Sequence, residues 1–294
     1  MDLPRYRLSH LRSAIRNPKR AFLELNKIYY TKVHGWEGID IVEEDWDNLI
    51  VLDACRYDSF RELNTISGKL EKVHSKGSMT VQFLRENFPD DGYPEIVYVS
   101  ANPNITWLDA KFHKRIRLWE NHTDGDKGVV PPQSVTAESL KYLDQYPNKR
   151  VIIHYMQPHY PFIGDFGQSL YERGLIEHRN NGNEFWHQIS TREASKQDFK
   201  MAYEENLRIV LQEVEKLTEN IDGKTIITSD HGNEFGRLGV YGHPSGTFTK
   251  GLTEVPWFII NSGVRKTIYS GTATDGPIEQ DTQLDDKLEA LGYA

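Results

Sequence analysis

The chain has 294 residues, 38% of them hydrophobic, and a net charge of −8, which is an ordinary composition for a globular protein with a large core. It contains no apolar run near the roughly 20 residues that cross a bilayer, and its basic N-terminus has no apolar stretch, so no secretory signal is expected. The single cysteine, Cys55, excludes an intrachain disulfide and fits a reducing compartment, so we expect a cytoplasmic protein.

The first 34 residues form a basic segment that we expect to precede a single domain over residues 35–294. This segment holds eight Lys or Arg against two acidic residues, and its apolar residues recur at helical spacing. Pro18 is expected to separate two short helices, since proline suits a first helical turn. Peripheral attachment to an anionic membrane is one interpretation, and a solvated helix packed on the domain is the other. Five basic residues are expected to be exposed: Arg5, Arg12, Arg16, Lys19 and Arg20.

The rest of the chain alternates strand and helix signals. Short apolar runs rich in β-branched residues predict strands, and longer amphipathic stretches predict helices. This alternation predicts an α/β fold with a central, mostly parallel sheet and helices on both faces. A polar stretch at 163–190 is expected to be a long loop, and 262–283 a surface tail. The expected strands are 48–53, 95–99, 150–155, 224–228 and 255–260, and the expected helices are 78–87, 134–145 and 191–219.

Polar residues follow several of these strands. Asp53 ends the first apolar run, and Asp230 and His231 come directly after the run at 224–228. Because parallel strands open their binding crevice at their carboxyl ends, we expect these three residues to converge on a divalent metal. Each residue alone also has a structural interpretation, since an Asp often caps the next helix. The strand near 150 ends in His154 and leads to His159.

The order of these motifs resembles the alkaline phosphatase superfamily, and within it the sulfatase-like branch that includes phosphoglycerol and phosphoethanolamine transferases. Residues 50–58, Ile-Val-Leu-Asp-Ala-Cys-Arg-Tyr-Asp, are similar to the first motif of the branch, and 229–234 to its Asp-His-Gly-Glu motif. The later Gly-x-His, Lys-Gly and Val-Pro sequences and the closing helix resemble 241–243, 250–251, 255–256 and 288–293. The resemblance covers most of 48–294 and implies metal-dependent hydrolysis or transfer of a phosphate or sulfate ester.

By the same resemblance, Thr80 falls at the position of the nucleophile, with Ser78 as the alternative. The start of a helix there favours anions, and a metal can activate a hydroxyl for attack on phosphorus or sulfur. The resemblance implies one divalent ion (Mg, Mn, Ca or Zn), held by Asp53, Asp230 and His231 together with Thr80. The structural alternative is that Ser78 or Thr80 only caps the helix.

The remaining roles also come from the resemblance. His243 and Lys250 would offset the charge of the transferring group, and His159 or His243 would protonate the departing alcohol. Arg56, Asn102 and Ser78 are expected to contact an anionic ester substrate such as a glycan or a lipid headgroup. Nucleic acid is not expected as a partner.

Three departures from the family pattern keep alternatives open. The Cys-x-Pro-Ser-Arg signature of formylglycine sulfatases is missing, so their aldehyde-hydrate mechanism is not expected. Gln157-Pro158-His159 replaces Asp-Pro-His, which favours a single metal, and Gln82-Phe83 replaces the usual Pro-Ser after the nucleophile. The alternatives are a catalytically silent relative that binds a glycan or an anionic headgroup, and a membrane-surface interaction protein.

Overall fold

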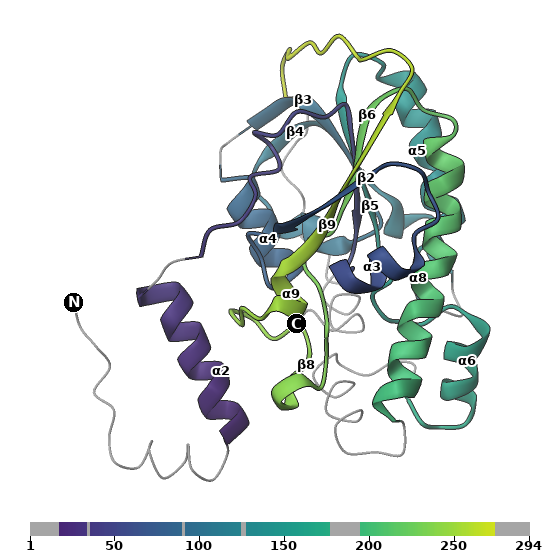
Figure 1. Cartoon of the computed structure of the whole chain (residues 1–294). Coiled ribbons are helices and arrows are strands. Elements are labelled where there is room, and N and C mark those ends of the chain that lie inside the picture. Colours follow the sequence, from purple (N-terminus) through teal and green to yellow (C-terminus); the bar gives the residue numbers. More distant parts are fainter. Residues whose placement is uncertain (1–17, 34–35, 90–91, 125–127, 177–194, 274–294) are drawn as a thin grey trace.

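A seven-stranded sheet forms the centre of the computed structural model, in the order β2-β9-β6-β1-β5-β3-β4 (Figure 1). The structure describes residues 18–33, 36–89, 92–124, 128–176 and 195–273. Every strand runs in the same direction except β9, which is antiparallel to both of its neighbours. The strands are β1 (Asn48–Leu52), β2 (Lys69–His74), β3 (Gly92–Ser100), β4 (Lys111–Arg117), β5 (Arg150–Tyr155), β6 (Gly223–Thr228) and β9 (Glu254–Ser262).

The predicted, mostly parallel α/β sheet is confirmed, and the strand expected at 255–260 is the exception to its parallel order. This strand, β9, pairs antiparallel with β6. The chain between them contains the small hairpin of β7 (Glu234–Phe235) and β8 (Tyr241–Gly242) and the one-turn helix α9 (Lys250–Thr253). Because antiparallel neighbours need no helical crossover, the chain can return to the sheet through this hairpin and a single helical turn.

Helices cover both faces of the sheet, and two side chains show which helix lies on which face. Tyr155 of β5 shares a 2.8 Å hydrogen bond with Thr136 of α5 (Pro132–Gln145), and α5 packs beside α8 (Lys196–Thr218). Tyr98 of β3 points the other way, and its ring lies 6.0 Å from that of Phe88, which ends α4 (Thr80–Asn87). The helix α3 (Tyr57–Leu63) packs with α8 on the α5 side.

The prediction of a long loop at 163–190 is wrong for part of this range, which forms the helix α6 (Asp165–Glu172). The Glu205 carboxylate of α8 accepts hydrogen bonds of 3.0 Å from the backbone N–H groups of Phe166 and Gly167, at the start of this helix. Because the capping carboxylate lies 38 and 39 residues away from these N–H groups in the sequence, the residues next to α6 give no sign that a helix starts here. Residues 177–190 lie outside the described part.

The described N-terminal segment is a helix, α2 (Pro18–Ile28), that begins at the expected proline and continues into a π-helical turn, η1 (Tyr29–Val33). Asn26 fixes it to the loop after β8: its Nδ2 donates to the Phe248 carbonyl at 3.0 Å, and its Oδ1 accepts from the Phe248 N–H at 2.7 Å. None of the described helices is long and apolar enough to span a bilayer. Outside the described part lie the first predicted helix with Arg5, Arg12 and Arg16, the Lys19 and Arg20 side chains, and the closing helix at 288–293.

Candidate active site

Three neighbouring strands, β6, β1 and β5, carry the site at their carboxyl ends. Val51 of β1 pairs with His154 of β5 and with Thr228 of β6. Partners in a parallel register share a face, and so do alternate residues along a strand. This register directs His154, and beyond the strand ends Asp53 and Asp230, toward the α4 face. All three side chains are fully buried.

The expected convergence of Asp53, Asp230 and His231 is present in the structure. His231 Nε2 lies 3.6 Å from Asp53 Oδ1 and 3.3 Å from Asp230 Oδ2. Asn102, expected to contact substrate, donates instead from Nδ2 to Asp53 Oδ2 at 2.6 Å, and its own Oδ1 accepts from the Asn104 N–H at 2.8 Å. The amide therefore orients the Asp53 carboxylate.

The turn after β1 is tied to the turn after β6. Ala54 has a left-handed backbone (φ 60°), which is uncommon for a residue with a Cβ, and its N–H donates to Asp230 Oδ1 at 3.0 Å. The next N–H, of Cys55, donates to Ser229 Oγ at 2.8 Å. Strained residues of this kind persist where the surrounding structure over-determines them, often at functional sites. Here the strained turn holds two carboxylates side by side.

Thr80 and Ser78, the two alternatives for the nucleophile, have different environments. The Thr80 hydroxyl donates to Asp230 Oδ2 at 2.7 Å and lies 3.3 Å from His231 Nε2, at the first residue of α4. The Ser78 hydroxyl instead donates to Gln82 Oε1 at 3.1 Å, and the Ser78 N–H does the same. Gln82, one of the departures from the family pattern, therefore holds the Ser78 hydroxyl in a hydrogen bond. Of the two candidate nucleophiles, Thr80 is the one whose hydroxyl contacts Asp230 and His231.

His159 and His243 form a pair next to the cluster. Their Nε2 atoms are 2.8 Å apart, and the His243 ring centre lies 4.6 Å from that of His231. His159 Nδ1 lies 2.5 Å from the Tyr160 carbonyl, which can only accept, so His159 Nε2 is the acceptor and His243 the donor of the pair. Burial lowers the pKa of both rings well below the usual value, so both are neutral at pH 7.

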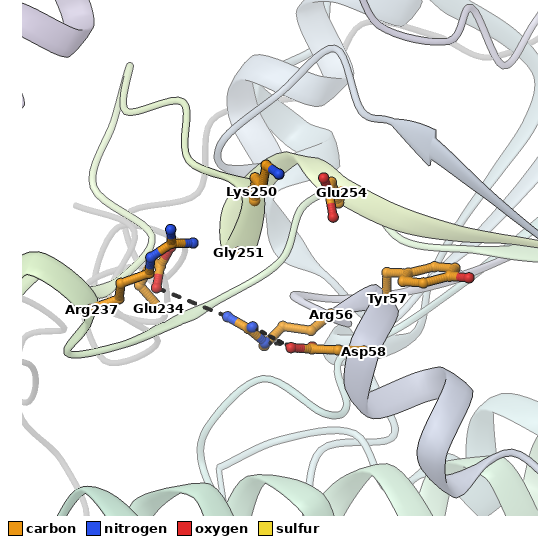
Figure 2. A pocket seen from close by; sticks show the side chains of 8 residues that line it. All are labelled: Arg56, Tyr57, Asp58, Glu234, Arg237, Lys250, Gly251 and Glu254. Atoms are coloured by element: carbon orange, nitrogen blue, oxygen red, sulfur yellow. Dashed lines mark hydrogen bonds and ion pairs between the residues drawn. The ribbon is translucent and has the colours of Figure 1, made fainter.

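Arg56 and Lys250 lie together in a separate cavity of ≈ 200 Å³ (Figure 2). Arg56 forms two hydrogen bonds to Asp58, at 2.7 and 2.5 Å, and lies 4.0 Å from Glu234. Burial would lower the pKa of Arg56, but the bond to Asp58 outweighs it and raises the pKa. The described lining of this cavity contains none of the predicted metal ligands, and its carboxylates Asp58 and Glu234 lie beside Arg56. The structure therefore does not bring Lys250 or Arg56 into the cluster, and their expected roles stay predictions.

The chemistry of the cluster fits a cation. His231 Nδ1 lies 2.8 Å from the Gly232 carbonyl and must carry the proton, so its Nε2 is a lone pair directed at two carboxylates. Burial lowers the pKa of His231 to about 4 and raises that of Asp230. Three acceptors directed at one another repel unless a positive ion lies between them. Asp53, Asp230 and His231 are therefore suited to hold a divalent metal.

His154 was not among the predicted ligands, although it lies beside them. One potential ligand atom from each of Asp53, His154 and Asp230 lies within 4.8 Å of the others. In the sequence His154 is the fifth residue of an apolar strand, where a histidine is usually part of the core. Gln157 is also buried, and its Nε2 donates to the Val130 carbonyl at 3.4 Å, so the expectation that it is not a ligand stays a prediction.

Comparisons with known proteins identify the family and the fold. A family model described as Sulfatase matches residues 76–293. The integral membrane protein lipooligosaccharide phosphoethanolamine transferase A of Neisseria meningitidis aligns with a TM-score of 0.51 and 14% identity, over 85% of this chain but 58% of that one. At that identity the likeness shows the fold alone.

Two further solved structures have lower scores. The zinc complex of the C-terminal periplasmic domain of EcEptC from Escherichia coli gives a TM-score of 0.49 and 13% identity, over 77% of this chain and 76% of that one. BT1596, a 2-O GAG sulfatase, gives a TM-score of 0.46 and 10% identity, over 76% of this chain and 65% of that one. Among curated proteins, none matches the sequence significantly. With the family model covering 76–293, the chain belongs to the sulfatase family, in the sulfatase-like branch of the alkaline phosphatase superfamily.

Proposed function

We propose that this protein hydrolyses or transfers a phosphate or sulfate ester, with the Thr80 hydroxyl as the nucleophile and a divalent cation held by Asp53, Asp230 and His231. Membership of the sulfatase family supports the reaction class. The observation that carries the residue assignment is the position of Thr80 Oγ1, 2.7 Å from Asp230 Oδ2 and 3.3 Å from His231 Nε2.

A cation at this position supplies charge that lowers the pKa of the Thr80 hydroxyl and offsets the negative charge of the ester oxygens. Asp230 Oδ2 already accepts the Thr80 proton in a hydrogen bond, so the carboxylate can take that proton as the oxygen attacks. Because both imidazoles are neutral, His243, which directs Nε2–H toward His159, would donate a hydrogen bond to the departing oxygen once substrate displaces His159 as the acceptor, and the departing alkoxide would take its proton from water. Water or a second alcohol then completes hydrolysis or transfer.

A groove of ≈ 490 Å³ beside Thr80 supports a glycan or headgroup as the rest of the substrate. Met79 and Val81, which flank Thr80 in the sequence, line it together with Trp107, Arg85 and Glu86. Trp107 is 45% exposed, and an open aromatic ring among planar polar groups suits a ligand with apolar faces and hydroxyl edges. Trp107→Ala should raise KM for a sugar ester and leave aryl ester turnover unchanged. Tyr269→Ala, 60% exposed on another segment, is the control.

An exposed apolar stripe along α2 and η1 supports attachment to a membrane. Leu25, Tyr29 and Val33 recur every four residues and are 66%, 46% and 71% exposed. An exposed apolar stripe in a basic segment suits the interface of an anionic bilayer. Deletion of residues 1–34 should abolish sedimentation with anionic vesicles while the domain stays folded, and Leu25→Glu should weaken it. Equal sedimentation of the intact and deleted proteins would contradict this proposal. A cytoplasmic location stays a prediction from the sequence.

An activity panel tests the reaction class. Aryl phosphate, aryl sulfate and a phosphodiester should each be incubated with metal-stripped protein and then with added Mg²⁺, Mn²⁺, Ca²⁺ or Zn²⁺. We expect turnover of at least one ester that requires metal and disappears in Thr80→Ala. Tight metal binding without turnover of any ester would instead support the catalytically silent relative.

A further inference from the structure

We propose that His154 of β5 is an additional ligand of the cation. The site would then have two imidazoles, those of His231 and His154, and the two carboxylates of Asp53 and Asp230. This inference rests on the proposed metal-dependent function and deepens it. His154 belongs to the strand β5 itself, whereas the other ligands follow the ends of their strands.

The sheet register places His154 within the sheet, two residues before the level of Asp53 on the neighbouring strand. His154 pairs with Val51, two residues before Asp53, and one pleat repeat along a strand spans about 6.6 Å. The long imidazole bridges this distance: one ligand atom each from Asp53, His154 and Asp230 falls within 4.8 Å of the others. Thr80 and His231 then approach the same carboxylates from α4 and from the turn after β6.

Tyr98 fixes the orientation of this ring. Its hydroxyl lies 3.0 Å from His154 Nδ1, and strands β3 and β5 are paired so that Tyr98 and His154 share the α4 face. When the phenol oxygen accepts from Nδ1–H, the Nε2 lone pair is left for a metal. Metal-binding histidines commonly have such a partner on their second nitrogen. We therefore assign Tyr98 as a positioning residue.

The buried Nε2 atom of His154 distinguishes this ring from a core histidine. Across the described chain it has no hydrogen-bond partner, although the residue is fully buried. An unsatisfied buried polar group destabilises the fold, so a purely structural role would favour an apolar residue of similar size. A bound cation removes this penalty.

The test is metal binding, measured apart from activity. Full-length wild-type protein and the His154→Gln, Tyr98→Phe and His74→Gln variants are stripped of metal and titrated with Zn²⁺ against a chromogenic chelator. The visible absorption of the Co²⁺ forms is recorded in parallel. His154→Gln should weaken Zn²⁺ binding more than about 100-fold and change the Co²⁺ spectrum, since a ring nitrogen leaves the coordination shell. Tyr98→Phe should weaken it about 10-fold, and the exposed His74→Gln control should match wild type.

Unchanged Zn²⁺ affinity and an unchanged Co²⁺ spectrum in His154→Gln would overturn the inference, even if the protein turns over esters. Weakened binding in the variant without ester turnover by wild type would support the inference and contradict the proposed function. Circular dichroism of the metal-free forms checks folding. If His154→Gln does not fold, Tyr98→Phe decides: affinity equal to wild type overturns the inference.

Discussion

The two ends of the central sheet handle buried charge in opposite ways. At the amino end, the buried Asp47 Oδ2 accepts from the Lys224 N–H at 2.7 Å and from Arg265 Nε, and the exposed Asp45 pairs with the same arginine at 2.6 Å. Lys149 donates to three backbone carbonyls and fixes the segment at 269–270 to the sheet. At the carboxyl end, Asp53, Asp230 and His231 instead direct acceptors at one another.

This difference separates a structural end from a functional one. Where each buried charge has an opposite charge or a carbonyl, the interactions hold the chain together. Where buried acceptors lie close together, their mutual repulsion destabilises the metal-free protein, and a bound cation offsets this repulsion. Substitutions at the two ends should therefore have opposite effects on the stability of the metal-free protein.

The largest effect is expected at the carboxyl end for Thr80. Thr80→Ala should lower turnover by at least about 10³-fold, because the attacking oxygen is lost, while metal binding stays mostly intact. Thr80→Ser should keep part of the activity. Steady-state kinetics with the best ester measures this, and Ser78→Ala is the control because its hydroxyl is occupied by Gln82. Full turnover in Thr80→Ala would transfer the role to Ser78.

Neutralising Asp230 should separate stability from function. Asp230→Asn removes a buried charge whose pKa burial already raises, so the metal-free protein should gain on the order of 1 kcal/mol in unfolding free energy. Its metal affinity should fall strongly. Thermal unfolding and chelator titration check the two results. A lower Tm for metal-free Asp230→Asn than for metal-free wild type would show that the cluster is not strained.

The corresponding change at the amino end should destabilise. Asp47→Asn weakens charge-assisted hydrogen bonds to Lys224 and Arg265, which should cost about 2 kcal/mol. Metal affinity should stay unchanged. Urea unfolding measures the loss, and an equal stability change in Asp47→Asn and Asp230→Asn would remove the contrast between the two ends.

A further effect at the amino end is a dependence of stability on pH. Burial lowers the pKa of Lys266 from 10.5 to about 8. Between these values the unfolded chain binds more protons than the folded one, so Lys266 adds stability as pH rises, and the dependence disappears below about pH 8. The unfolding free energy of wild type minus that of Lys266→Met should therefore increase from pH 8 to 10.5. A flat difference would show that Lys266 stays protonated in the fold.

The sequence identifies the buried strands well and the edge strands poorly. The runs at 48–53, 95–99, 150–155 and 224–228 are all strands of the sheet, because strands buried on both faces read as continuous apolar runs. The edge strands β2 and β4 were not predicted, since β2 reads Lys-Leu-Glu-Lys-Val-His and β4 is rich in Lys and Arg. Edge strands often carry charges, which hide them from hydrophobicity patterns.

The site shows a similar division. Asp53, Asp230 and His231 were predicted because each follows a strand, where a polar residue is conspicuous. His154 was overlooked because its partners Tyr98 and Asp53 come from other strands and only the register unites them. Lys250 was expected beside the cluster by resemblance, whereas α9 directs it into the cavity with Arg56.

The central claim is that Thr80 receives the transferring group at the carboxyl end of the sheet. Its most direct test is peptide mapping by mass spectrometry of acid-quenched protein during turnover of the best aryl ester, with and without metal. We expect a phosphoryl or sulfuryl group on the peptide that contains Thr80, present in metal-loaded wild type and absent after chelation. Sustained metal-dependent turnover, with Thr80 unmodified and Thr80→Ala equally active, would contradict the account.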